Sequence, residues 1–364
     1  MSSYDDVLIR TPRTQRRRPK RRFFKHYSWD WDIPKMNDNA LFLASSDLTD
    51  YVSSKIMLDR FEANQPTLIK EISFLCKKQE WLTFSQTAFP WKTFEMTDER
   101  GAFINENDNT LILFNSHPTS VELKIFSDQA NINHIVKICS NEFEVVECYI
   151  EWMYSSDGSS VDIPLRPDKL PVSEMYPFLG EESLSDYYNR FMESDSSILL
   201  LIGPPGTGKT SFIRGLLQHR KTSAVVTYDA GILDKDYVFA RWIESDAAIM
   251  VLEDADTFLK SRKEGNTMMH KFLNVGDGLV TTKGKKLIFS TNLPSSKDID
   301  PALVRPGRCF DILTFDNLTA EQAQQAADKL GVKLVGDKDI WTVADIFHQQ
   351  THAVKNVENK IGFV

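Results

Sequence analysis

The residues from Gly203 to Thr210 have the types and the spacing to bind a polyphosphate. They read Gly-Pro-Pro-Gly-Thr-Gly-Lys-Thr and satisfy the pattern G-x-x-x-x-G-K-[ST]. Glycines carry no Cβ, so backbone N–H groups can close around phosphate oxygens, and a helix N-terminus adds a favourable dipole. Lys209 would supply positive charge for the β- and γ-phosphates, and the Thr210 hydroxyl is placed to ligate Mg²⁺. The predicted binding residues are Gly203, Pro204, Pro205, Gly206, Thr207, Gly208, Lys209, Thr210 and Ser211.

This stretch needs a buried strand before it and a helix after it. Residues 197–202 are an apolar, β-branched run, and residues 211–217 have the composition of a helix. A glycine-rich turn that matches by accident is expected on the order of once in a hundred chains of this length. The strand and helix on either side argue against that alternative, and the stretch predicts a nucleoside-triphosphate site.

Two acids follow a second buried strand about forty residues later. Residues 247–252 are apolar, and the chain then reads Glu253-Asp254-Ala255-Asp256. In such an arrangement one carboxylate holds Mg²⁺ through water, and its neighbour polarises the attacking water. We assign the metal to Glu253 and the base to Asp254, and the exchanged assignment, with Glu253 as the base, is the alternative. An acidic turn without function is the alternative, and the spacing from the phosphate-binding loop argues against it.

A further strand, predicted at 286–290, leads into Thr291-Asn292, and residues 300–308 read Asp-Pro-Ala-Leu-Val-Arg-Pro-Gly-Arg. With these motifs in order, residues 170–350 resemble the AAA ATPases, whose second region of homology contains T-N and then D-P-A-[LI]-x-R-P-G-R. Residues 268–278 and the Glu-Asp order are most similar to the branch of the mitochondrial Rieske-protein translocase.

The resemblance implies roles for three more side chains. Asn292 matches the polar sensor that positions the attacking water. Arg305 matches the arginine finger that is offered to the nucleotide of a neighbouring subunit, and Arg308 matches a second arginine of that interface. A guanidinium can spread γ-phosphate charge, and such a finger is typically worth ~10³–10⁵ in rate. The family implies ATP and Mg²⁺ as cofactors and a homo-oligomer, usually a hexameric ring.

The chain departs from the family in three ways. Most AAA proteins have Asp-Glu where this chain has Glu253-Asp254, so the base would be shorter by about 1.5 Å, and slow turnover is one consequence. Residues 231–237 show no aromatic–apolar–glycine pore loop, which leaves threading of a substrate open. The transmembrane helix of the mitochondrial translocase has no counterpart here.

The predicted fold is α/β: a P-loop AAA core with a parallel sheet and a small helical lid, preceded by an α+β amino-terminal domain. We place a basic arm at 1–35, the amino-terminal domain at 36–167, the core at 168–316 and the lid at 317–364. A proline-rich stretch marks the boundary near 168. Within the amino-terminal domain we expect helices from Ser46 and from Pro66, strands at 110–114, 121–126, 143–154 and 161–165, and a core built from the aromatic residues of 81–94.

Composition sets the remaining expectations. The 364 residues are 41% hydrophobic and 26% charged, with a formal net charge of −8, and they contain no apolar run long enough to span a bilayer. The four cysteines are far apart, which predicts reduced thiols and a cytoplasmic location. Nine Lys or Arg residues and no acid lie between Arg10 and Lys25, so this arm either contacts nucleic acid or is a solvated tail.

Three functions follow from these expectations. The first is an oligomeric, Mg²⁺-dependent ATPase that remodels a protein or a protein–nucleic-acid assembly, with the amino-terminal domain selecting the target. The second is a nucleic-acid-associated motor or loader, for which the basic arm is the support. The third is a nucleotide-gated scaffold with little hydrolysis, which the Glu-Asp order would favour. The identity of the target does not follow from these residues.

Overall fold

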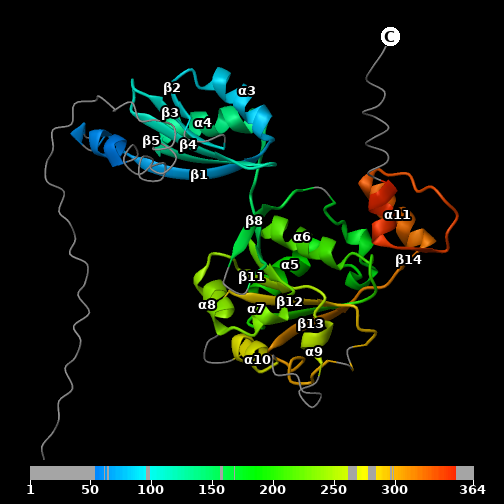
Figure 1. Ribbon diagram of the computed structural model, residues 1–364. Helices are drawn as coiled ribbons and strands as arrows, with labels where there is room; N and C mark the ends of the chain where they lie inside the picture. The colour runs from blue at the N-terminus through cyan, green and yellow to red at the C-terminus, as the bar shows by residue number, and fades with distance from the viewer. Residues whose placement is uncertain are drawn as a thin grey trace, which may run out of the picture.

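The computed structural model describes residues 54–349, apart from 61, 64, 96–98, 156–158, 168, 261–268, 278–283, 296 and 298. The basic arm and the first part of the helix expected from Ser46 lie outside the described residues. Two separate β-sheets dominate the described part of the chain, one in its amino-terminal third and one in the remainder (Figure 1).

The amino-terminal sheet is antiparallel and has two helices packed on it. Its strands run in the order β2-β3-β4-β5-β1-β6, and its helices are α3 and α4 (Figure 1). Their bounds are Leu68–Leu75 for β1, Lys78–Ala88 for α3, Lys92–Glu95 for β2, Arg100–Asn105 for β3, Thr110–Ser116 for β4, Val121–Ser127 for β5, Gln129–Glu142 for α4 and Glu144–Val145 for β6.

An aromatic core fills the space between this sheet and its helices. Trp81 of α3 is fully buried, and its ring centroid lies 5.9 Å from that of Phe84 and 5.9 Å from that of Phe114. Ile132 and Ile135 of α4 belong to the same cluster. Burial of such large apolar side chains is the main stabilising contribution available to a layer of this size. The prediction that the aromatic residues of 81–94 form a core is confirmed for Trp81, Phe84 and Phe89.

The helix predicted after Pro66 is wrong, because residues 68–75 form strand β1. The apolar positions there fit a helical spacing, but the segment pairs along its length with β5, from Leu68 opposite Ser127 to Phe74 opposite Val121. Cross-strand pairing and burial against α4 outweigh a local periodicity that is ambiguous over so short a run. The strands predicted at 110–114 and 121–126 are confirmed as β4 and β5.

The second sheet has seven strands in the order β13-β9-β12-β11-β10-β7-β8. All its pairs are parallel except β7 with β8. The bounds are Tyr149–Met153 for β7, Ser160–Pro164 for β8, Ile198–Ile202 for β9, Ala224–Thr227 for β10, Ile249–Leu252 for β11, Lys286–Thr291 for β12 and Cys309–Thr314 for β13. Every residue of β9 is buried, as expected for a strand covered on both faces.

Strands β7 and β8 belong to this second sheet, whereas the sequence analysis places residues 149–164 in the amino-terminal domain. Ile150 of β7 pairs with Ala224 of β10, and β8 extends the sheet beyond β7. The sequence pattern indicates both strands, but it carries no information on which sheet edge they join. By hydrogen bonding, the last strand residue of the first sheet is Val145.

Helices cover both faces of the second sheet (Figure 1). Residues of α5 (Leu184–Glu193) and α6 (Lys209–Arg220) pack in one apolar cluster, together with the short 3₁₀ turn η1 (Ser173–Met175). A second cluster, on the opposite face, takes residues of α7 (Ala230–Leu233), α8 (Asp236–Glu244), α9 (Asp256–Leu259) and α10 (Met269–Asp277). Another 3₁₀ turn, η2, spans Pro177–Leu179. This three-layer α/β architecture confirms the predicted core.

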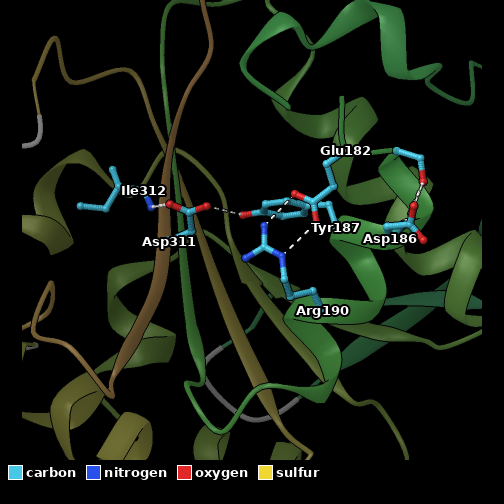
Figure 2. A network of polar contacts seen from close by, with 7 residues as sticks. Glu182, Asp186, Tyr187, Arg190, Asp311 and Ile312 are labelled. Atoms are coloured by element: carbon cyan, nitrogen blue, oxygen red, sulfur yellow. Dashed lines mark hydrogen bonds and ion pairs between the residues drawn. The ribbon is translucent and has the colours of Figure 1, made fainter. Parts of the chain in front are cut away.

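Helix α5 is fixed to edge strand β13 by a polar network (Figure 2). The Tyr187 hydroxyl donates to Asp311 Oδ2 at 3.1 Å. Arg190 donates two hydrogen bonds to Glu182, at 2.9 and 2.8 Å, and its guanidinium carbon lies 4.9 Å from the centroid of the Phe310 ring. Burial raises the pKa of Tyr187, so its hydroxyl keeps its proton and remains a donor to Asp311.

The carboxy-terminal elements form a small unit. Strand β14 (Leu318–Thr319) pairs with β15 (Ile340–Trp341), and between them lies α11 (Ala320–Leu330). Thr319 caps α11 in a capping box with Gln322, and Gly331, at a φ of 68°, ends the helix. Residues 343–349 form one more helix. Within the part of the chain that the structure describes, no helix is long and apolar enough to cross a membrane.

Candidate nucleotide-binding site

The loop between β9 and α6 has a backbone that glycine alone adopts without strain. Gly206 and Gly208 have φ values of 84° and 94°, in the left-handed region. A Cβ at Gly203 would lie 2.2 Å from the Phe315 carbonyl oxygen, so this position is closed to any side chain by a neighbouring strand end. The predicted arrangement of strand, loop and helix is present, because the loop joins the end of β9 at Ile202 to the start of α6 at Lys209.

Lys209 lies under this loop with its ammonium group held by three acceptors. Its Nζ donates to the carbonyl oxygens of Gly203 at 2.5 Å and Pro204 at 3.0 Å, and to Asn292 Oδ1 at 3.0 Å. The residue is only 8% exposed. Burial lowers the pKa of Lys209, and the carboxylates of Asp254, Asp256 and Glu253 oppose that shift. The Lys209 ammonium is therefore held in a desolvated position beneath the phosphate-binding loop.

The two acids after β11 contact different partners. The Thr210 hydroxyl donates to Glu253 Oε1 at 2.9 Å. The Asn292 amide donates from Nδ2 to Asp254 Oδ1 at 3.1 Å. Asp254 has a φ of 50°, which is a left-handed conformation that aspartate tolerates better than most residues. Glu253 is thus paired with the predicted metal ligand, and Asp254 with the predicted sensor.

A cavity of about 820 Å³ lies over these groups. Its lining combines the phosphate-binding loop, both acids and Asn292 with residues from the carboxy-terminal unit. The backbone N–H of Ala344 donates to the Gly206 carbonyl at 3.0 Å, so the helix at 343–349 rests directly on the loop. The cavity therefore lies between the parallel sheet and the small helical unit, and its volume is in the range of ligand pockets.

The donor set fits a nucleotide with Mg²⁺. Thr210 and Glu253 offer two oxygen atoms 2.9 Å apart, and Mg²⁺ prefers oxygen ligands, commonly one or two from the protein with the rest from phosphates and water. Thr210 and Glu253 are accordingly the residues that would hold the ion. Gly206 and Gly208 adopt left-handed φ values that let the loop backbone curve around phosphate oxygens, as a phosphate-binding loop requires.

Arg305 and Arg308 lie away from this cavity. The Ile198 N–H donates to the Arg308 carbonyl at 3.1 Å, which puts the arginine pair at the amino end of β9. Gly203 lies at the other end of that strand, about 17 Å away at ~3.3 Å per residue. Arg305 is exposed, and neither arginine lines the cavity. The chain therefore does not bring its own arginine pair to its own phosphate-binding loop.

Several lining residues were not predicted from the sequence. Arg214 lies one turn after Thr210 on α6, so helical spacing from the motif could have indicated it. Lys169, Phe347 and His348 also line the cavity, but no motif marks them, and they come from segments distant in sequence. Asp256 contacts Asn292 without lining the cavity.

The structure combines a glycine-rich loop between β9 and α6, two acids just after β11, and an asparagine just after β12, the strand that lies between β9 and β11. This arrangement defines a P-loop nucleoside triphosphatase. Residues 199–317 match the family model described as "ATPase family associated with various cellular activities (AAA)". The chain thus carries an AAA ATPase domain, which confirms the family that the motifs indicate.

Among curated proteins, the chain is 35% identical over 191 residues to AAA-ATPase At3g50940 of Arabidopsis thaliana, a match that covers 46% of this chain and 42% of that protein. It is 31% identical over 176 residues to the probable mitochondrial chaperone bcs1 of Schizosaccharomyces pombe, covering 46% and 38%. It is 33% identical over 129 residues to 26S proteasome regulatory subunit 8 of Caenorhabditis elegans, covering 30% of each chain. The chain thus spans less than half the length of these three relatives.

Proposed function

We propose that this protein binds ATP with Mg²⁺ at the cavity between the phosphate-binding loop and the carboxy-terminal unit, and hydrolyses it. The observation that carries the proposal is the division of the two acids, Glu253 on the Thr210 hydroxyl and Asp254 on the Asn292 amide. A metal-holding carboxylate and a separate carboxylate beside a polar sensor are the two roles that hydrolysis needs.

Different residues of the site would bind the phosphates and activate the attacking water. Backbone N–H groups of the loop and the Lys209 ammonium would bind the phosphates, with Lys209 exchanging its bonds to carbonyl oxygens for bonds to phosphate oxygens. Asn292 would orient a water molecule, and the Asp254 carboxylate would accept its proton. Bound Mg²⁺ would supply charge neutralisation for the transferred phosphoryl group.

Oligomer formation is part of the proposal, because neither Arg305 nor Arg308 of the same chain lines the cavity. Arg305 is exposed at the edge of the sheet opposite the loop, a position suited to a neighbouring copy's nucleotide. The family is typically oligomeric, and a ring in which each Arg305 serves the next subunit would satisfy this geometry. We propose that such a homo-oligomer, hexameric by analogy with the family, remodels a protein or a protein–nucleic-acid assembly in the cytoplasm, and that the antiparallel amino-terminal domain selects the target.

A second function, a nucleotide-gated scaffold with little turnover, is favoured by one specific observation. Asp254 holds the base position with a side chain one bond shorter than glutamate, and a misplacement near 1 Å can cost ~10²-fold in rate. The two functions differ in the rate constant for hydrolysis and not in affinity for ATP.

The test is steady-state phosphate release by the full chain with MgATP, with EDTA and with the Lys209→Ala variant. The proposal expects Mg²⁺-dependent turnover that Lys209→Ala abolishes. ATP binding without phosphate release above that of Lys209→Ala would favour the scaffold. The absence of both binding and turnover would contradict the proposed site.

A further inference from the structure

Asp256 joins the turn that carries the two acids to the strand end that carries the sensor. It lies two residues beyond Asp254, at the start of α9. Its Oδ1 accepts a hydrogen bond from the backbone N–H of Asn292 at 2.9 Å and another from the Thr291 hydroxyl. One carboxylate oxygen therefore binds both Thr291, the last residue of β12, and Asn292, the residue that follows it.

A backbone hydrogen bond adds to this connection. The Ala255 N–H donates to the Ser290 carbonyl at 2.9 Å, so the turn after β11 is bonded to three successive residues, Ser290, Thr291 and Asn292. Between these links and β11 lies Asp254, held at a φ of 50°. A non-glycine residue in that conformation is sustained only where surrounding contacts fix the backbone. The hydrogen bonds of Ala255 and Asp256, together with that between Asp254 and Asn292, are contacts of this kind.

Asn292 connects Asp256 to the groups that would take part in hydrolysis. Its side chain accepts from Lys209 and donates to Asp254, while its backbone is held by Asp256. Asp256 itself does not line the cavity. Apart from the attraction between its carboxylate and the Lys209 ammonium, Asp256 would therefore affect catalysis through the placement of Asn292 and Asp254.

We propose that Asp256 is a positioning residue for ATP hydrolysis, which acts by anchoring Asn292 relative to the base Asp254. Asp256 is assigned no role as acid, base or metal ligand. The expected effect of Asp256 on kcat rests on the proposed function. The hydrogen bond from the Asn292 N–H to Asp256 can be tested without ATP hydrolysis.

Three variants separate positioning from charge. Asp256→Ala removes both accepted hydrogen bonds, so kcat should fall roughly 10- to 100-fold, as a displacement near 1 Å would produce. The dissociation constant for ATPγS should change by less than about threefold, because the residue does not touch the cavity. Asp256→Asn keeps an oxygen at Oδ1 and should retain kcat within about threefold of the wild type.

Asn292→Ala is the third variant, and it gives a double-mutant cycle. If Asp256 acts through Asn292, adding Asp256→Ala to Asn292→Ala should lower kcat by less than about threefold further. The matched control is Asp229→Ala, because Asp229 also follows a strand of the sheet and caps a short helix through the N–H groups of Gly231 and Ile232. This control should leave kcat unchanged.

Hydrogen exchange tests the anchor independently of activity. The Asn292 amide N–H should exchange at least about tenfold faster in Asp256→Ala than in the wild type or Asp256→Asn, since its acceptor is lost. Equal loss of kcat in Asp256→Asn and Asp256→Ala, an undiminished effect in the Asn292→Ala background, or unchanged exchange at Asn292 would each overturn the proposal. A wild-type chain without turnover would refute the proposed function alone, and the exchange experiment would still decide the anchor.

Discussion

The carbonyl of Arg308 accepts a hydrogen bond from the N–H of Ile198, at the opposite end of β9 from the phosphate-binding loop. Because all neighbours of β9 are parallel to it, the loop and both acids gather at the carboxyl edge of the sheet, while the R-P-G-R segment stays at the amino edge. One chain thus holds the phosphate-binding loop and the R-P-G-R segment at opposite edges of its sheet. In the oligomer that we propose, a neighbouring copy would bring its R-P-G-R segment to this loop.

Replacement of Lys209 by alanine should remove ATP binding. The ammonium is the cation nearest the loop, and it is buried with the carbonyl groups of Gly203 and Pro204 as acceptors. Isothermal titration calorimetry should show the affinity for ATP reduced at least about 100-fold, a loss of ~2.7 kcal/mol. Lys221→Ala, at the exposed end of the same helix, is the control and should bind as the wild type does. Unchanged affinity in Lys209→Ala would exclude this loop as the site.

The two acids should fail in different ways. Asp254→Asn should bind MgATP normally and hydrolyse it slowly, because it retains size and polarity but loses the proton acceptor. Glu253→Gln should mainly raise the Mg²⁺ concentration needed for half-maximal activity, because this carboxylate is the partner of Thr210. Titration of Mg²⁺ at saturating ATP distinguishes them. If Glu253→Gln lost kcat and Asp254→Asn lost metal affinity, the base would be Glu253.

The elements that form the site could be predicted from the sequence where the signal is local. The run before Gly203, the glycines themselves and the acids after residue 252 each mark a strand end or a turn by their own composition. Asn292 could be assigned from the resemblance to the AAA ATPases, and the structure places it with the loop and the two acids at one edge of the parallel sheet. The pairing of Glu253 with Thr210, and of Asp254 with Asn292, follows from that shared edge.

Contacts between distant segments could not be predicted in this way. The apolar positions of 68–75 fit a helix until their partner β5 is known, and nothing in residues 149–164 specifies β10 as their neighbour. The contact of Ala344 with Gly206 likewise depends on how the carboxy-terminal unit folds back on the core. Local periodicity describes one segment, whereas these features depend on which two segments meet.

Lys286 should make stability depend on pH. Its buried ammonium donates to the carbonyl oxygens of Ser194 and Ser196, and burial lowers the pKa of Lys286 to about 8 from its ordinary 10.5. Between these values the unfolded chain binds a proton that the folded chain has lost, so this group favours folding more as pH rises and loses that contribution as pH falls through about 8.

Urea unfolding at pH 7.5, 8.5 and 9.5 measures this effect as a difference between variants. The wild type should gain stability relative to Lys286→Met as pH rises, whereas Lys333→Met, at an exposed position, should follow the wild type. Parallel pH profiles for the wild type and Lys286→Met would mean that the lysine titrates alike in the folded and unfolded chain.

Deletion of residues 1–25 should weaken binding to nucleic acid without changing basal ATPase activity. The removed segment contains the nine basic residues between Arg10 and Lys25. Phosphate contacts release counterions, so the slope of log K against log salt concentration should become shallower in the deletion variant. Fluorescence anisotropy with single- and double-stranded oligonucleotides at several salt concentrations measures it. An unchanged affinity and slope would identify the arm as a solvated tail.

Mixing two inactive variants tests the central claim, that the site of one subunit is completed by Arg305 of another. Arg305→Ala should bind ATP normally and lose turnover by ~10³-fold or more, while Arg220→Ala, at another exposed arginine, should remain active. Arg305→Ala subunits keep a competent loop and Lys209→Ala subunits keep a competent arginine, so phosphate release by the mixture should exceed that of either variant alone and should rise with total protein concentration. A mixture no more active than its components, together with wild-type activity per subunit that is independent of concentration, would show that each chain contains a complete site.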